Sequence, residues 1–247
     1  MEGPGVYLIR EKLTFLKGFN VVEVSGSSKI EKDRLIGDKL ISVDSVGKQL
    51  YLLFQETALR VHFGMYGSFR INSQKPGKKP RLQLKFFKEG RNPVIVYFYN
   101  TSLRLVNQAE LNLEHFRDVL NKNFDREWAL ERIKLDQRII SDVLLDQEIF
   151  AGIGNIIKNE ALFLAKVHPE SIACKIPDGV ARDLVDKSIQ FSLIFLEHRK
   201  KGWPLKKVLM VYNRKFCPLC DSKLRVRYVG SSRRKTFYCE NCQRLYA

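Results

Sequence analysis

The chain has 247 residues and a formal net charge of +16, with 45% hydrophobic and 11% aromatic residues. That length allows one large or two ordinary domains with a packed core, and the excess positive charge indicates a polyanionic partner, either nucleic acid or an anionic membrane surface. No run of about 18 apolar residues and no secretory leader is present, so we expect no membrane partner and a cytoplasmic, nucleoid-associated or nuclear protein.

The first 118 residues are predicted to form a domain of one helix and many strands. Apolar residues fall at helical spacing from Val6 to Leu16, and Gly18 ends the pattern. Runs with period two follow, and we expect about seven short strands in them: residues 21–24, 39–46, 49–54, 58–63, 66–71, 82–87 and 94–99. Short strands without intervening helices indicate a β-sandwich or a barrel.

The pattern becomes helical after a linker predicted at residues 119–128. Residues 129–212 are expected to form a helical domain, whose longest helix runs from Asp178 to Lys201. The predicted class is therefore α+β with two domains, and residues 213–247 form a small additional unit.

The most informative stretch of the helical region is LLDQEIFAGIGNIIKNEALFLAKVHP, residues 144–169. We expect a helix over 139–150, a break at Gly152 and Gly154, and a second helix with Asn155 as its N-cap. The free amides and positive dipole end at that start suit an anion such as a phosphate. An ordinary corner between two core helices explains the same pattern.

Four of the five cysteines form two Cys-x-x-Cys pairs near the end of the chain. Eighteen residues separate Cys220 of the first pair from Cys239 of the second. With Cys217 and Cys242, these thiolates have the spacing of a ribbon that closes a tetrahedral, structural Zn²⁺ site. A cytosolic redox pair is the alternative.

The last fifth of the chain carries most of the positive charge. From Arg199 onward there are 14 Lys and Arg against two acidic residues, which is three quarters of the net charge. Two strands and a basic tip with Arg233, Arg234 and Lys235 are expected between the cysteine pairs. A solvated basic face is the ordinary explanation, but a hairpin held by a metal is suited to contact a phosphate backbone.

This order of parts resembles the formamidopyrimidine-DNA glycosylase and endonuclease VIII family of base-excision repair enzymes, over essentially the whole chain. Residues 144–169 match the family's helix-two-turn-helix segment almost residue for residue. HFGMYGSFRI at 62–71 is similar to the strand whose side chain wedges into the duplex, and RKTFYCENCQR at 234–244 is similar to the zinc-finger hairpin. The implied fold is an amino-terminal helix with a β-sandwich, then the helical domain and a zinc ribbon.

The resemblance implies a bifunctional enzyme. Such an enzyme flips an oxidised base out of double-stranded DNA, cleaves its glycosidic bond and nicks the strand by elimination. Met65 is the implied wedge, with Tyr66 available to stack, although a plain core methionine is the alternative. Asn155 and Arg234 are the implied phosphate contacts.

Two further residues correspond to the family's chemistry. Lys48, in a Gly-Lys turn between two strands, matches the lysine that reaches DNA near the lesion, although by spacing alone it is an ordinary hairpin charge. Glu2 matches the acid that protonates the departing sugar oxygen and moves protons during elimination. A carboxylate that stabilises a helix start is a compatible interpretation of Glu2.

The catalytic amine departs from the family pattern. The family's mature chain begins with proline, whose secondary amine attacks C1′ of the damaged nucleotide, whereas this chain begins Met1-Glu2. We expect the bulky Glu2 to disfavour removal of Met1, so the Met1 α-amine, with an ordinary pKa of about 8, is the expected Schiff-base former. A nearby cation such as Lys48 would lower that pKa and increase the free-amine fraction.

Two other departures concern specificity. Gly5 stands where the family often has a second glutamate. The segment NTSLRLV at 100–106 lies where the family often places an arginine and a phenylalanine that pair with the orphaned base, and Arg104 and Leu105 are the nearest occupants. The start EGP, together with Tyr66 after Met65, favours the endonuclease VIII branch and oxidised pyrimidines.

Two functions remain open. The first is an active glycosylase and abasic-site lyase that acts as a monomer on damaged duplex DNA. The second is a protein that binds abasic or distorted DNA but lost efficient chemistry, which the missing proline favours. An RNA- or ribosome-associated protein is a remoter option, against which the sandwich and the terminal motif argue. His62 and Cys174 are expected to be structural.

Overall fold

A computed structural model describes residues 1–247 and divides them into two compact units. One unit holds Met1 and residues 6–113, and the other holds residues 2–5 and 114–247. Helix α1 (Gly3–Leu13) therefore begins in one unit and continues in the other. The finer division proposed from the sequence, with a linker at 119–128, stays a prediction.

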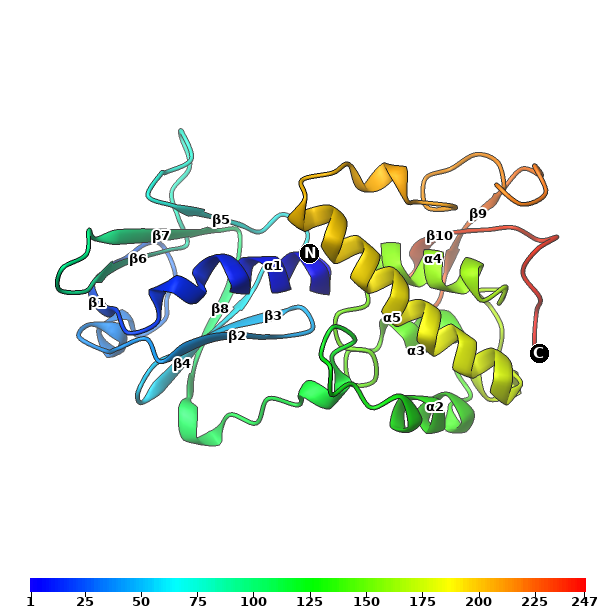
Figure 1. Cartoon of the computed structure of the whole chain (residues 1–247), viewed down its shortest axis with the longest axis horizontal. Coiled ribbons are helices and arrows are strands. Elements are labelled where there is room, and N and C mark those ends of the chain that lie inside the picture. Colours follow the sequence, from blue (N-terminus) through cyan, green and yellow to red (C-terminus); the bar gives the residue numbers. More distant parts are fainter. The chain divides into compact units, whose positions relative to one another are not determined.

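The unit that contains most of the strands has two four-stranded antiparallel sheets (Figure 1). The first has the order β1-β6-β7-β5, with β1 (Asn20–Ser25), β5 (Ser68–Ile71), β6 (Leu82–Phe87) and β7 (Val94–Tyr99). The second has the order β2-β3-β4-β8, with β2 (Ser42–Val46), β3 (Gln49–Leu53), β4 (Thr57–His62) and β8 (Ser102–Asn107). The predicted sandwich is confirmed, and β8 is an additional strand that pairs with β4.

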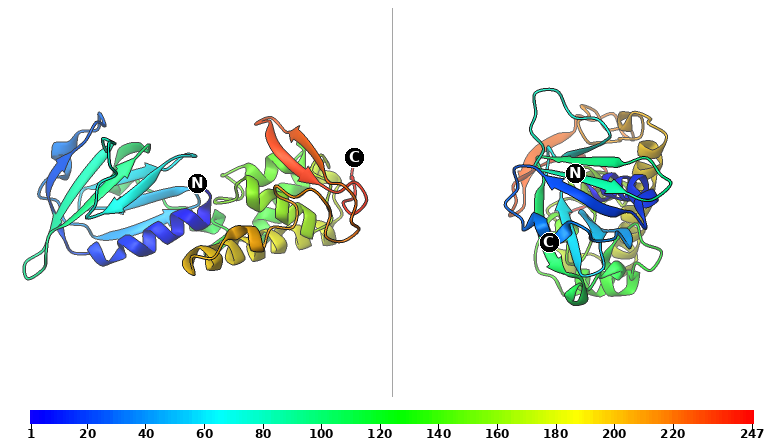
Figure 2. Two further views of the ribbon diagram at one scale, coloured as in Figure 1. Left: turned by 90° about the horizontal axis from the view of Figure 1, so that it is seen from above. Right: turned by 90° about the vertical axis from the view of Figure 1, so that its left-hand side faces the viewer.

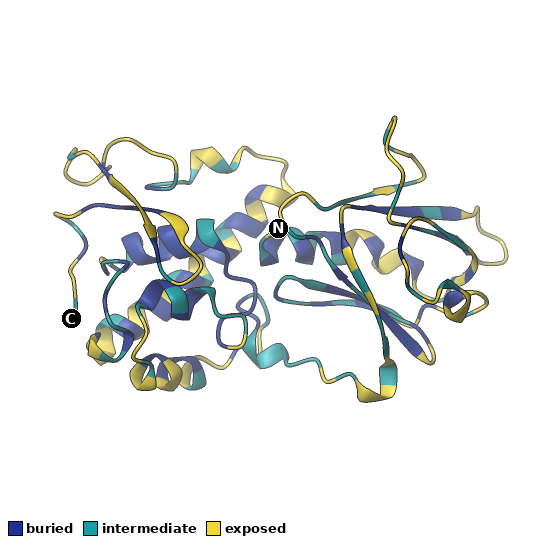
Figure 3. Cartoon of the chain, turned by 180° about the vertical axis from the view of Figure 1, so that it is seen from behind, coloured by how far each residue is buried: buried dark blue, intermediate teal, exposed yellow.

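The core of this unit lies between the two sheets and one side of α1. Leu84 and Val96 of the first sheet share a buried cluster with Leu52 and Val61 of the second. The apolar stripe of α1, which starts at Val6, joins the same cluster, as its spacing predicts, and the opposite side of the helix is more exposed (Figure 3). A short 3₁₀ turn, Thr14–Leu16, extends the helix.

The other unit contains four α-helices around a second apolar core. These are α2 (Arg126–Leu135), α3 (Ile140–Leu145), α4 (Asn155–Leu164) and α5 (Asp178–Lys200). Helix α3 ends five residues before the end of the helix predicted at 139–150. Asp146 Oδ1 accepts the backbone N–H of Glu148 at 3.0 Å, and this local bond competes with continuation of the helix.

The cysteine-rich segment forms a two-stranded hairpin, β9 (Arg225–Val229) and β10 (Arg234–Tyr238), which lies beside α4 (Figure 2). Three hydrogen bonds hold β10 to the helix. Asn155 Nδ2 donates to Lys235 O at 2.8 Å, and Lys158 Nζ donates to Thr236 Oγ1 at 2.7 Å. The backbone N–H of Phe237 donates to Asn159 Oδ1 at 2.6 Å. Successive hairpin residues are thus aligned with one face of α4.

Candidate functional site

A carboxylate from the start of the chain occupies the amino-terminal end of α4. Glu2 Oε1 accepts the N–H of Ile156 at 2.7 Å, and Glu2 Oε2 accepts the N–H of Ile157 at 3.3 Å. These first-turn amides have no partner within the helix, and the helix dipole favours negative charge there. The N-cap position belongs to Gly154, so the prediction that Asn155 caps the helix is wrong.

The two glycines before α4 allow this approach of Glu2. Gly152 has φ +103°, and its carbonyl accepts the N–H of Gly3 at 2.9 Å. A Cβ on Gly154 would lie 2.3 Å from the carboxyl carbon of Glu2. Any side chain at position 154 would therefore displace the carboxylate from the helix start.

Substitution Gly154→Ala is expected to lower the free energy of unfolding by about 1–3 kcal/mol, because the added methyl group collides with Glu2. Thermal and urea unfolding measure the change. Gly179→Ala is the matched control, because nothing lies within 4 Å of a Cβ at that helical position. Equal effects of the two substitutions would show that Gly154 is not needed for the approach of Glu2.

Asn155 and Arg234 are far apart in the sequence, and the contact between α4 and the hairpin brings their elements together. Asn155 is the first residue of α4, and its amide binds the backbone of Lys235, the neighbour of Arg234. Arg234 begins β10 and is exposed. The fold thus brings these two predicted phosphate contacts to neighbouring elements of one unit, and their roles stay predictions.

The amino terminus lies at a tight turn in the strand-rich unit. The α-amine of Met1 donates a hydrogen bond to the carbonyl of Gly64. The turn closes where the N–H of Gly67 donates to the carbonyl of Phe63 at 2.7 Å. The predicted nucleophile therefore lies beside the turn that carries the predicted wedge.

Met65 and Tyr66 form the tip of that turn. Their exposed fractions are 69% and 77%. The alternative that Met65 is a plain core methionine is therefore wrong. Two large exposed apolar side chains on a tight turn are available to a ligand, as the wedge prediction requires.

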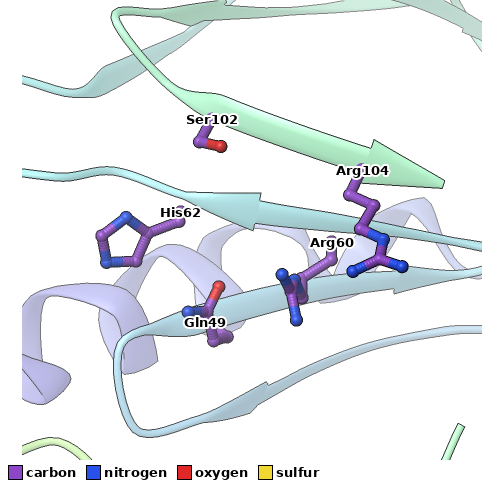
Figure 4. A pocket seen from close by; sticks show the side chains of 5 residues that line it. All are labelled: Gln49, Arg60, His62, Ser102 and Arg104. Atoms are coloured by element: carbon purple, nitrogen blue, oxygen red, sulfur yellow. The ribbon is translucent and has the colours of Figure 1, made fainter. Parts of the chain in front are cut away.

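The remaining predicted residues of this unit lie on the second sheet. Lys48 follows Gly47, which has φ +55°, in the turn between β2 and β3, as predicted. Arg104 lies on β8 and lines a pocket of about 210 Å³ with Gln49, Arg60, His62 and Ser102 (Figure 4).

Sequence reasoning missed Arg60 and treated His62 as a packed residue. The available signal was the alternation along β4, where positions 60 and 62 share a face while Leu59, Val61 and Phe63 are buried.

The four predicted ligand cysteines form one cluster. All their Sγ atoms lie within 4.8 Å of one another, and the pairs Cys217–Cys242 and Cys220–Cys239 are separated by 3.7 Å and 3.5 Å. Four thiolates at about 2.3 Å from a tetrahedral Zn²⁺ would be about 3.8 Å apart, so the arrangement fits that ion. Cys174 lies outside the cluster, as expected.

Both units match domain models of known proteins. Residues 2–100 match the model of the formamidopyrimidine-DNA glycosylase N-terminal domain, and residues 116–193 match that of the formamidopyrimidine-DNA glycosylase H2TH domain. The chain belongs to the formamidopyrimidine-DNA glycosylase and endonuclease VIII family. The family prediction from the sequence is therefore confirmed.

Relatives within this family include Endonuclease 8-like 3 of Mus musculus, 35% identical over 211 residues that cover 82% of this chain and 34% of the relative. Endonuclease 8-like 3 of Xenopus laevis is 32% identical over 99% of this chain and 41% of its own length. The chain thus spans about a third to two fifths of these relatives.

The fold is shared with solved structures of the family. The formamidopyrimidine-DNA glycosylase of Lactococcus lactis, solved with DNA containing an abasic site, aligns with a TM-score of 0.85 and 22% identity. The alignment covers 98% of this chain and 99% of that protein. The fold of this family member therefore includes the sandwich, the helices and the cysteine ribbon. No helix in it has the length and apolar character needed to span a membrane.

Proposed function

We propose that this protein is a base-excision-repair DNA glycosylase with abasic-site lyase activity that removes oxidised bases, preferably pyrimidines. The observation that supports the proposal most is the position of Glu2. Its carboxylate is held by two backbone amides at the start of α4 and directly follows the Met1 amine in the chain. The bonds to the helix start would stabilise a non-catalytic protein as well, so the support comes from the place of this acid directly after the Met1 amine.

The proposed chemistry uses two groups. The Met1 amine attacks C1′ of the damaged nucleotide, so that an N–C1′ bond forms while the glycosidic bond breaks and the base leaves with a proton. Glu2 protonates the sugar ring oxygen as the ring opens to the imine. Loss of a proton from C2′ then expels the 3′ phosphate, and water releases the sugar fragment from the amine.

The binding residues are proposed from the same family pattern. Met65 would fill the space left by the flipped base, and Tyr66 would stack beside it. Lys48 and Arg104 would contact the DNA from the strand-rich unit, and Asn155 and the exposed Arg234 would contact phosphates from the helical unit.

Zn²⁺ is the proposed resident metal, held by Cys217, Cys220, Cys239 and Cys242. A closed site of four thiolates is structural, and the bound ion would hold the two ends of the ribbon together. The buried residues around these cysteines include Val211, Leu224 and Phe237. This small core positions the basic hairpin without taking part in the reaction.

The proposed partner is damaged double-stranded DNA, bound by a monomer in the bacterial nucleoid or in a nucleus. The charge of +16 supports a polyanionic partner. The Lactococcus lactis protein of the same fold was solved with DNA containing an abasic site.

Borohydride trapping on duplex DNA with an abasic site, followed by peptide mass mapping, tests the proposal. We expect a covalent adduct on the Met1 amine of the untagged protein. A variant extended by two residues before Met1 is the control, because it moves the amine away from Gly64. An adduct on Lys48 would contradict the role of Met1, and no adduct despite tight binding would contradict the lyase activity.

The alternative function is a damage-binding protein without efficient chemistry. The specific observation in its favour is Met1 at the position where the family has proline. The absence of both trapping and base release, with selective binding of abasic DNA retained, would establish it.

A further inference from the structure

The pocket on the second sheet is strongly cationic. Five side chains line it, and none of them is acidic: Gln49, Arg60, His62, Ser102 and Arg104. Figure 4 shows the side chains of Arg60 and Arg104 on the same face of the sheet. Since guanidinium groups stay charged at any physiological pH, this face carries at least two positive charges in a small volume.

The two arginines are directly opposite one another across neighbouring strands. Arg60 of β4 pairs with Arg104 of β8 in the antiparallel register, and His62 pairs with Ser102. Like charges at directly opposed positions destabilise a sheet. Asp44, which lies opposite Tyr51 in the register of β2 and β3, forms an ion pair with Arg10 at 3.7 Å and does not line the pocket. This arrangement is therefore one that a bound anion would stabilise.

His62 is surrounded by positively charged groups. Burial lowers the pKa of His62, and the amino terminus, Lys48 and Arg60 lower it further by electrostatic repulsion. These surroundings disfavour the charged form of His62, and an anion in the pocket would favour it.

One polar atom at the edge of the pocket is unsatisfied. Gln49 Oε1 is buried and has no hydrogen-bond partner. A buried acceptor without a donor costs free energy, and rotation of the amide would instead direct its two N–H donors toward a bound anion. Gln49 lies opposite His62 in the register of β3 and β4, so both side chains are adjacent.

We propose that this pocket is an anion subsite in which Arg60 and Arg104 together hold a backbone phosphate of the bound DNA. This assignment rests on the proposed function and deepens it. Two guanidinium groups facing one site match the charge and the several acceptor oxygens of a phosphodiester. A single arginine would suffice for an uncharged orphaned base, the role that the family resemblance implies for Arg104.

The test is the salt dependence of binding to a duplex that carries a non-cleavable abasic-site analogue. Arg60→Met and Arg104→Met are each expected to weaken binding and to reduce the slope of log K against log salt by about 0.9, equally for all four bases opposite the lesion. Arg91→Met is the matched control, because Arg91 is an exposed arginine of the same unit outside the pocket.

A second measurement uses inorganic phosphate and the NMR titration of the four histidines. Phosphate is expected to raise the pKa of His62 in the wild type and not in the Arg60→Met/Arg104→Met double variant. Circular dichroism of the wild type and of the double variant checks that both proteins are folded. A phosphate response with unchanged salt slopes would overturn the DNA assignment and leave a site for free small anions.

The outcomes separate this inference from the proposed function. If the wild type cleaves abasic DNA but both pocket variants behave like Arg91→Met, the inference is wrong and the function stands. If weakening depends on the opposite base, Arg104 contacts a base edge and the phosphate assignment is wrong. If the wild type neither binds nor cleaves abasic DNA, the proposed function is wrong and the inference fails with it.

Discussion

Replacing Glu2 by glutamine is expected to reduce base removal by about 10²- to 10⁴-fold while DNA binding persists. The amide is nearly isosteric with the carboxylate but cannot transfer a proton to the sugar oxygen. Single-turnover release of an oxidised pyrimidine from duplex DNA measures the loss. Trapping on a preformed abasic site should persist, since the Met1 amine is unchanged.

The structure also predicts a stability cost for this substitution. Both carboxylate oxygens of Glu2 accept backbone N–H groups at the start of α4, whereas glutamine has one acceptor and an N–H₂ group that faces a donor. We expect a loss of about 1–3 kcal/mol in the free energy of unfolding. The reaction must therefore be assayed well below the melting temperature of the variant.

Glu89→Gln is the matched control, because Glu89 is an exposed carboxylate in the turn between β6 and β7. It should leave both base release and stability unchanged. Normal turnover by the Glu2→Gln variant would remove Glu2 from the mechanism. Lost turnover together with lost binding would instead indicate a structural role.

Replacing Cys239 by serine is expected to abolish zinc binding and to unfold the ribbon. Structural Zn²⁺ sites contribute about 10–16 kcal/mol of apparent binding free energy in small finger peptides, and a serine hydroxyl does not replace a thiolate ligand. Cys239 is fully buried in the ribbon core, so the loss extends to the packing around it. Release of β10 from α4 would then remove Arg234 from its position and weaken DNA binding.

Elemental analysis of the purified protein measures the zinc content, which we expect to fall from one ion per chain to none. Cys174→Ser is the control, because this half-buried cysteine lies outside the cluster and should keep both metal and binding. Full DNA affinity in a metal-free Cys239→Ser protein would contradict the role of the ribbon as a DNA contact.

Local patterns account for what the sequence predicted well. The alternation in residues 82–87 predicts β6, and the long helical stripe predicts α5 to within one residue at its end. The spacing of the cysteine pairs predicts their cluster, because a short knuckle fixes two ligands locally. The early end of α3 was not predicted, because the apolar spacing continues beyond it. The side chain of Asp146 accepts the backbone N–H of Glu148 there, and this bond competes with the helix.

The sequence by itself determined the family, the two-part organisation and the zinc-ribbon spacing. Each of these depends on a local pattern of residues that are close together in the chain. Only the tertiary structure decided that Glu2 accepts hydrogen bonds from the backbone amides of Ile156 and Ile157, which lie more than 150 positions further along the chain. It also decided that Met1 bonds to Gly64 and that Arg60 faces Arg104 across β4 and β8. Such contacts depend on the register and packing of distant elements, which periodicity within one segment does not specify.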